Sequence, residues 1–225
     1  MRWAAFLIGA LAFFVLQCSA RAAPQVEVAP VVVELPAGKA IASIRIRNVT
    51  DAPVAFEARV YAWSQDDAGR DVLRESGDLA VWPPAFVAPS GGAQIVRVAA
   101  QTASAPAVER AYRVVFSQQP LGVEAAEGLR LRLQLSLPVF VAPAHAMDRA
   151  PEMFMVEGAP RRLRVTNPGN RRITLDIAEN PSLPRYLLAG STVEGEAAAP
   201  PRSARFAAAG GDMRPLAWPG DGRAR

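Results

Sequence analysis

The stretch from Leu129 to Val141 has the strictest pattern of apolar and polar positions in the chain. Every odd position carries leucine or valine, and the even positions from 130 to 136 carry arginine, arginine, glutamine and serine. A strand directs successive side chains to opposite faces, so this period of two predicts one long strand with an apolar stripe. At about 3.3 Å per residue it would span roughly 40 Å, far more than a usual strand of about five or six residues. Such a strand either crosses a whole β-sandwich or presents part of its stripe to another molecule.

Shorter segments of the same alternating type precede this stretch. Turn residues separate them. Because proline cannot donate to a ladder, Pro30 predicts an edge strand or a switch between sheets, and Pro83 and Pro84 predict an edge strand. Seven or so strands in about 120 residues, with no helical period, predict a β-sandwich of immunoglobulin type whose last strand is 129–141. The predicted earlier strands are 25–34, 40–47, 54–63, 81–86, 93–99 and 111–116.

A second, weaker series of strands follows the linker at 142–145. The fold class predicted for the chain is therefore all-β, with two immunoglobulin-like sandwiches in tandem over 23–143 and 144–225. The pattern fades from Glu194 onward, and we expect a poorly ordered tail after about residue 195. The strands of the second series are predicted at 153–157, 161–166, 171–177 and 186–189.

Residues 1–22 have the features of a secretory signal peptide. A short basic start precedes an apolar run that is too short to span a membrane, and small residues follow it. We expect cleavage after Ala22, or else after Ala20, and an exported protein with no stable membrane insertion. Cys18 is the only cysteine, and Gln17 before it disfavours the alternative of a lipoprotein. The mature chain would then lack thiols and disulfides.

The composition argues against nucleic-acid binding and catalysis. The formal net charge is +4, and loss of the leader lowers it by two. The positive charge that remains is too small to indicate a nucleic-acid partner. His145, in the linker, is the only histidine, so neither a metal cluster nor a catalytic triad can be assembled around it. Asp66 and Asp67 stand before Gly69 and predict a hairpin tip rather than a carboxylate pair. We therefore expect no enzyme activity, no cofactor and no metal.

Two features remain as candidates for binding. The leucine stripe is either the core face of a closing strand or an edge offered to the open sheet of a partner. Its length, its leucines and the polar loop before it favour the second alternative. Arg97 and Arg113 each stand between apolar residues of a predicted strand. They are either exposed to solvent or form a pair that grips a carboxylate between the two sandwiches.

The segment from Ala111 to Pro120, the following loop and the run Leu129 to Pro143 resemble the PapD-like periplasmic pilus chaperones. The Tyr-Arg-Val-Val-Phe and Leu-Pro-Val-Phe-Val sequences within them are most similar to the archaic branch associated with spore-coat-U-type pilins. The turn at 165–170 also resembles an asparagine-centred turn of the family, and the similarity spans about residues 25–190.

The resemblance implies a boomerang-like pair of sandwiches that binds pilus subunits by donor-strand complementation and delivers them to an outer-membrane usher. The last strand of the first domain would be lent to a subunit. Its later positions, Leu137, Val139 and Val141, would remain in the chaperone core. The donated residues would be Leu129, Leu131, Leu133 and Leu135.

One departure from the family concerns the site for the subunit's C-terminal carboxylate. Members of the family use an arginine on the first strand and a lysine late in the last strand of the domain. Val31, Val32 and Pro138 occupy these regions, and Lys39 is the only lysine. Because this arginine–lysine pair is absent, we expect Arg97 and Arg113 to bind the subunit's C-terminal carboxylate instead.

Two alternatives remain open from the sequence. A secreted two-domain structural or adhesive module, similar to a pilus subunit, is the nearer one, and a hydrolase is the more distant. A subunit should lack its own final strand, whereas this chain has one. The sequence also leaves open whether the free protein self-associates to cover its stripe.

Overall fold

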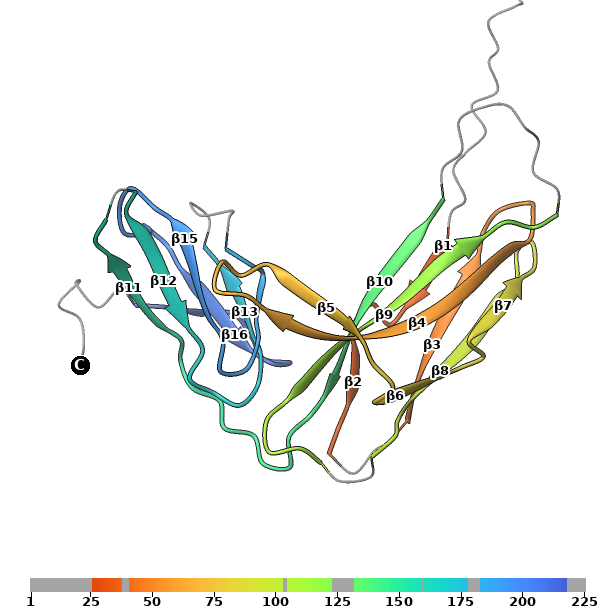
Figure 1. Cartoon of the computed structure of the whole chain (residues 1–225), viewed down its shortest axis with the longest axis horizontal. Helices are drawn as coiled ribbons and strands as arrows, with labels where there is room; N and C mark the ends of the chain where they lie inside the picture. Colours follow the sequence, from red (N-terminus) through yellow and green to blue (C-terminus); the bar gives the residue numbers. More distant parts are fainter. Residues whose placement is uncertain are drawn as a thin grey trace, which may run out of the picture.

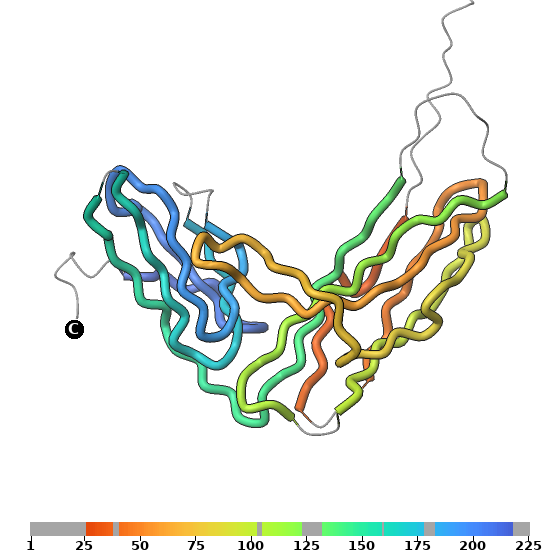
Figure 2. The backbone as a smooth tube through the Cα atoms, in the orientation of Figure 1, coloured from red at the N-terminus to blue at the C-terminus, as the bar shows by residue number. Residues whose placement is uncertain are grey.

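The computed structural model describes residues 26–37, 41–102, 105–122, 132–158, 160–177 and 183–217. Its described residues form strands and no helices, arranged as two lobes in the shape of a V (Figures 1 and 2). The all-β class and the two immunoglobulin-like sandwiches predicted from the sequence are confirmed. The signal-peptide prediction for 1–22 lies outside the described residues.

The first lobe is a sandwich of two sheets. The first sheet has four strands in the order β1-β3-β8-β6, and the second has the order β2-β10-β9-β4-β5, with β7 also paired to β4. The strands are β1 (Val26–Ala29), β2 (Val33–Leu35), β3 (Ile41–Asn48), β4 (Val54–Gln65), β5 (Asp71–Glu75), β6 (Leu79–Trp82), β7 (Ala85–Ala88), β8 (Ala93–Ala100), β9 (Arg110–Gln119) and β10 (Gln134–Val141).

The core of this lobe lies between the two sheets, where alternate residues of each strand meet. Ile44 and Val96 of the first sheet pack in one cluster with Val114 and Phe116 of the second, and all four are fully buried. The chain passes between the sheets at two proline segments, and the sequence offered such a switch as an alternative only for the first. Pro30 lies between β1 and β2, and Pro83 and Pro84 lie between β6 and β7.

The last strand of the first lobe is shorter than the sequence predicts within the described residues. Strand β10 begins at Gln134, although the N–H of Gln118 still donates to the carbonyl of Leu133 (2.9 Å). Leu129 and Leu131 lie outside the described residues.

The second lobe is a smaller sandwich of two further sheets, with strand orders β11-β12-β15 and β14-β13-β16-β17. Its core includes Met153, Leu163, Val165, Ile173 and Val193. The strands are β11 (Glu152–Val156), β12 (Arg162–Thr166), β13 (Ile173–Asp176), β14 (Tyr186–Leu187), β15 (Thr192–Glu196), β16 (Arg205–Ala208) and β17 (Arg214–Pro215).

The region after residue 195 differs from the expectation of a poorly ordered tail. Strand β16 lies inside its sheet, paired with β13 on one side and with β17 on the other. Ala204 and Ala207 are buried there. These small side chains fit against β13 but give almost no alternating signal in the sequence.

One buried asparagine organises a turn in each lobe. The amide of Asn48 donates to the carbonyls of Ala52, Ala88 and Pro89. The amide of Asn167 similarly donates to three carbonyls, those of Arg171, Leu187 and Leu188. Both asparagines are fully buried, and each satisfies backbone groups that the end of a strand would otherwise leave unpaired.

The β4–β5 hairpin extends from the first lobe to the second (Figure 1). The Gln65 side chain donates to the carbonyl of Tyr186 (2.6 Å) and accepts from the N–H of Leu188 (3.0 Å). At the tip, the carbonyl of Asp67 accepts from the N–H of Glu194 (3.1 Å). The hairpin thus touches β14 and β15, which are edge strands of the two sheets of the second lobe.

Candidate functional site

Strand β10 has one paired edge and one open edge. On one side it pairs with β9 along its whole length, from Gln134 to Val141. On the other side β2 pairs only with the end of the strand, from Val139 to Val141. Within the described ranges, no strand pairs with 134–138 on that side. The early half of β10 is therefore an edge to which a further strand can be added.

The hydrogen bonds at both ends of β10 show which backbone groups face this open edge. The carbonyl of Leu133 accepts from β9, and the N–H of Ala142 donates to Leu35 on the β2 side. Because backbone groups alternate in direction along an antiparallel strand, odd residues bond to β9 and even residues face the other side. Gln134 and Ser136 therefore present both an N–H and a C=O, and Pro138 presents a C=O alone.

Two of the candidate leucines lie beside the open edge. Leu133 and Leu135 are partly buried and pack against the core of the first lobe, whereas Leu137 and Val139 are members of that core. The burial of the apolar side chains therefore decreases from Val139 toward Leu133. Gln134 and Ser136, on the opposite face, are exposed. Leu129 and Leu131 belong to the part of the chain that the structure does not describe.

The structure does not bring Arg97 and Arg113 together. Arg97 lies on β8 between buried Val96 and Val98, so it points outward from the first sheet. Arg113 lies on β9 and points outward from the second sheet, because its neighbours Tyr112 and Val114 are in the core. The two guanidinium groups therefore lie on opposite outer faces of one sandwich and cannot grip the same carboxylate.

Of these two arginines, only Arg113 lies on the face that turns toward the second lobe. Its guanidinium carbon is 3.8 Å from the ring centre of Trp63, and its Nη2 is 3.1 Å from Oδ2 of Asp71. The Arg113 side chain is 18% exposed and that of Asp71 is 41% exposed. This single-point ion pair at a partly open position leaves Asp71 replaceable by another carboxylate.

Aromatic side chains join the lobes beside Arg113. Trp63 of β4, Phe140 of β10 and Leu188 of the second lobe form a buried cluster. The ring of Tyr186 lies 6.1 Å from Trp63 and 5.9 Å from Phe140. Around Trp63 and Phe140, the outer face of the second sheet is therefore an interface between the lobes.

A buried arginine of the second lobe, which was not predicted from the sequence, completes this interface. Arg172 Nη1 lies 2.7 Å from Oε2 of Glu109, Nη2 pairs with Glu34, and its guanidinium carbon lies 3.6 Å from the ring centre of Phe140. The Arg172 N–H also donates to Glu109 (2.8 Å). The only sequence signal was the pair Arg171-Arg172 after a turn, which by itself does not distinguish a buried arginine from an exposed one.

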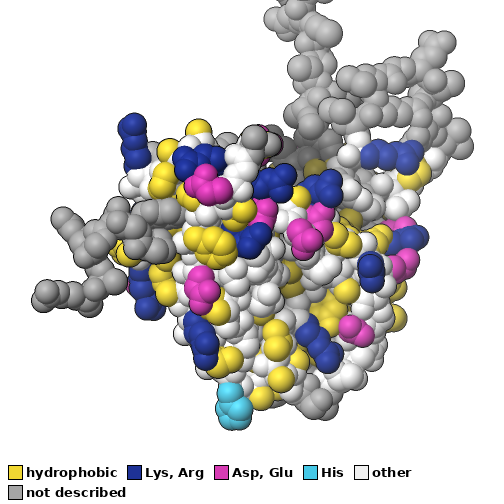
Figure 3. Space-filling view, turned by 60° about the vertical axis from the view of Figure 1, so that its left-hand side comes forward, with side chains coloured by type: hydrophobic (Ala, Val, Ile, Leu, Met, Phe, Trp, Pro, Cys, Tyr) yellow, Lys and Arg dark blue, Asp and Glu magenta, His cyan; other side chains and the backbone are white. Residues whose placement is uncertain are grey.

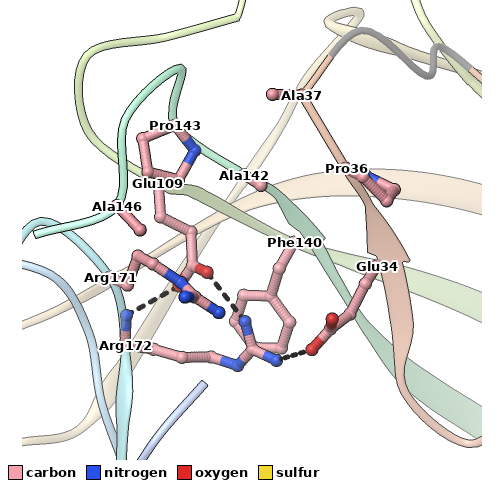
Figure 4. A pocket seen from close by; sticks show the side chains of 10 residues that line it. All are labelled: Glu34, Pro36, Ala37, Glu109, Phe140, Ala142, Pro143, Ala146, Arg171 and Arg172. Carbon is pink, nitrogen blue, oxygen red and sulfur yellow. Dashed lines mark hydrogen bonds and ion pairs between the residues drawn. The ribbon is translucent and has the colours of Figure 1, made fainter. Parts of the chain in front are cut away.

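A pocket of about 210 Å³ lies at this junction (Figure 4). Its lining includes Phe140 and the charged residues Glu34, Glu109, Arg171 and Arg172. Burial raises the pKa of the Glu109 carboxyl, although the nearby Arg172 guanidinium opposes this effect. Because the cations and carboxylates here already pair with one another, the junction holds the lobes together rather than presenting free charges.

The described residues hold no group of three or more histidine, cysteine, aspartate or glutamate side chains that could bind a metal. His145 is exposed in the linker, and Figure 3 shows it in cyan at the surface. Asp66 accepts from the backbone N–H groups of Ala68 and Arg70, as its predicted place in a hairpin requires. A helix long and apolar enough to cross a membrane is not found in the described part of the chain.

Comparison with solved structures gives matches across most of the chain. A chain in the CsuC–CsuE chaperone–tip adhesion subunit complex of Acinetobacter baumannii superimposes with a TM-score of 0.66 at 16% identity, covering 87% of this chain and 97% of that one. The Salmonella enterica SafA pilin–SafB chaperone complex gives 0.66 at 16% identity, with coverage of 88% and 98%. The Escherichia coli chaperone DraB gives 0.63 at 14% identity, with coverage of 87% and 97%.

The family comparison is more specific than these likenesses of fold. No curated protein matches the chain. The model of the PapD N-terminal domain, described as a pili and flagellar-assembly chaperone, matches residues 25–146. This range contains both sheets of the first lobe and the open edge of β10, and the family is one of chaperones rather than enzymes. Since the match covers more than half of the 225 residues, the chain belongs to the family of pili and flagellar-assembly chaperones.

Proposed function

We propose that this protein is a periplasmic chaperone of the archaic branch that binds pilus subunits by lending them strand β10 and delivers them to an outer-membrane usher. The observation that carries the proposal is the open edge at 134–138 beside half-buried Leu133 and Leu135. Two of the matched structures are complexes of a chaperone with a tip adhesion subunit or a pilin. The leader at 1–22 and the domains at 23–143 and 144–225 form part of this proposal.

Donation of β10 supplies both backbone and side-chain contacts. The groups of Gln134 and Ser136 continue the ladder into a subunit that lacks a strand. Leu133 and Leu135 enter its core, with Leu129 and Leu131 extending the same stripe. Burying each leucine contributes roughly 1.5–3 kcal/mol, so the four together supply on the order of 6–12 kcal/mol before ordering costs.

The subunit's C-terminal carboxylate binds Arg113 in this proposal. Asp71 holds the guanidinium in the free protein, and the incoming carboxylate takes its place over the face of Trp63. Arg97 does not take part, because it lies on the opposite outer face. Replacing Arg113 with methionine should therefore weaken subunit capture, and replacing Arg97 with methionine should leave it unchanged.

The double variant Leu133→Asp and Leu135→Asp tests strand donation directly. The chaperone and a pilus subunit from the same bacterium are produced together in the periplasm, and the complex is recovered through a tag on the chaperone. We expect the variant to lose the subunit, because two carboxylates cannot enter an apolar groove. The matched control Gln134→Asp changes an exposed residue of the same strand and should retain it.

Amide hydrogen exchange provides a readout that does not depend on substitution. The N–H groups of Gln134 and Ser136 should exchange rapidly in the free protein and slowly in the complex. Capture by the aspartate double variant at the normal level, or unchanged exchange at these two amides, would contradict strand donation. If the double variant unfolds, Leu133→Ala with the same exchange measurement replaces it.

The chaperone function is favoured over the structural-module alternative by one observation. A pilus subunit should lack its own final strand, whereas β10 is present in the second sheet of the first lobe, with Val139 fully buried in the core.

A further inference from the structure

The outer face of the first sheet carries side chains that the proposed function does not use. This sheet lies on the side of the first lobe away from the second lobe (Figure 1). Residues that alternate with the core positions of β3, β8 and β6 point outward. They form a surface that we call the outer face, made up of Ile41, Ser43, Arg45, Arg47, Ala80, Trp82, Ala93, Ile95, Arg97 and Ala99.

Three large apolar side chains on the outer face are exposed. Trp82 is 67% exposed, Ile41 61% and Ile95 45%. Trp82 lies directly opposite Arg97, and Ile95 lies directly opposite Arg45. Opposed residues on neighbouring strands have Cβ atoms about 4.5–5.5 Å apart, so each of these pairs combines an apolar surface with a guanidinium.

The charge of the outer face is positive and incompletely compensated. Arg47 pairs with Glu27 (3.1 Å), but Arg45 and Arg97 have no ion pair with any carboxylate that the structure describes. A hollow of about 320 Å³ lined by Glu27, Ala29 and both Arg45 and Arg47 adjoins this face at β1. Arg97 lies beside the exposed Trp82 and Arg45 beside the exposed Ile95, and arginine and tryptophan are both enriched at protein interfaces.

We propose that the outer face docks an acidic segment of another protein, with at least one aromatic or aliphatic side chain packing on Trp82 and Ile95. Carboxylates of that segment would bind Arg45 and Arg97, because guanidinium forks match carboxylate geometry. A membrane surface fits less well. The apolar residues are separated by Ser43 and alanines on a sheet face, and they do not form the continuous apolar strip that inserts into lipid.

The position of the outer face makes this docking compatible with subunit capture. The open edge of β10 belongs to the second sheet, and the outer face belongs to the first, with the core of the lobe between them. A partner on the outer face would therefore bind the free and the loaded chaperone alike. The inference does not depend on strand donation and is tested on the protein alone.

The test uses a fluorescein-labelled random copolymer of glutamate and tyrosine as the probe, with binding followed by fluorescence anisotropy. We expect the unchanged protein to bind it more tightly than labelled polyglutamate. Trp82→Ala and the pair Arg45→Gln with Arg97→Gln should each weaken binding by about tenfold or more. The matched control is Arg205→Gln with Arg214→Gln, which removes two exposed strand arginines from the second lobe and should not weaken binding.

Three results would overturn the proposal. Equal loss in the control pair would mean that only total charge matters. Unchanged binding in Trp82→Ala would show that Trp82 does not contact the bound segment. Tighter binding of the unchanged protein to phosphatidylglycerol vesicles than to the copolymer would assign the face to a membrane. Thermal unfolding of each variant serves as the folding control, since the substituted side chains are exposed.

Discussion

Arg172 Nη1 lies 2.7 Å from Oε2 of Glu109, and this ion pair joins the two lobes with side chains only 6% and 2% exposed. The residues are separated by 63 positions in sequence. Glu34 contacts the same guanidinium from β2, and Phe140 lies beneath it. One side chain of the second lobe therefore contacts β2, β10 and the residue that precedes β9. The orientation of the lobes and the position of β10 are set by the same contacts.

Replacing Arg172 with methionine should strongly destabilise the protein. Removing one partner of a buried pair leaves the other charge without compensation, at a cost of about 3–5 kcal/mol. The measurement is the free energy of unfolding from urea titration, with small-angle scattering to follow the separation of the lobes. We expect a lower unfolding midpoint and a wider distribution of lobe separations.

The double variant Arg172→Met with Glu109→Gln distinguishes the cost of an unpaired charge at Glu109 from the cost of losing the other contacts of Arg172. It removes both charges, and the glutamine oxygen can still accept the N–H of residue 172. It should therefore be more stable than Arg172→Met alone. A double variant that is less stable than the single one would show that Glu109 acts elsewhere.

The pH dependence of stability should contain a contribution from Glu109. Burial raises the pKa of its carboxyl above the ordinary value, so the folded protein retains this proton to a higher pH than the unfolded chain does. The associated stability is fully present below the unfolded-state pKa, about 4.3, and is lost as the pH rises through the folded-state pKa. The free energy of unfolding of the unchanged protein, relative to Glu109→Gln, should decrease across that range. A difference that stays constant or increases with pH would contradict the raised pKa.

Gly69 at the tip of the β4–β5 hairpin should tolerate alanine less well than Gly91. Both glycines have positive φ, +75° and +65°, so alanine is strained at either position. A Cβ at Gly69 would also lie 2.9 Å from Cδ of Pro184 in the second lobe, whereas nothing lies within 4 Å at Gly91. We expect Gly69→Ala to lower the free energy of unfolding by about 1–3 kcal/mol more than Gly91→Ala does. Equal losses would indicate that the hairpin tip moves away without cost.

Strands with one face in the core were predictable from the sequence. In β3, Ile44 and Ile46 are buried and Arg45 and Arg47 are exposed, and this difference is what produces the period of two. The edge position of β6 followed from Pro83, because proline lacks the N–H that a central strand needs. The family resemblance carried by β9 and β10 is confirmed by the match over residues 25–146.

Contacts between the lobes were not predictable in the same way. Strand β5 has four exposed residues out of five, because it lies at an edge, so it gives no alternating pattern. The pairing of Arg172 with Glu34 joins residues 138 positions apart, and no local pattern marks either of them. Arg97 and Arg113 were expected to face one cleft because both stand between apolar residues. That pattern shows that a side chain faces away from the core, but it does not show from which sheet.

The β4–β5 hairpin has a consequence for how the chain reaches its native state. It bonds to β14 through Gln65 and to β15 through Asp67, and both bonds come from a segment that precedes the second lobe in the chain. A chain that is synthesised from its N-terminus can complete the first lobe before residues 186–196 are available. The hairpin then offers fixed partners to the later strands, so the first lobe can serve as a folding template for its own C-terminal neighbour.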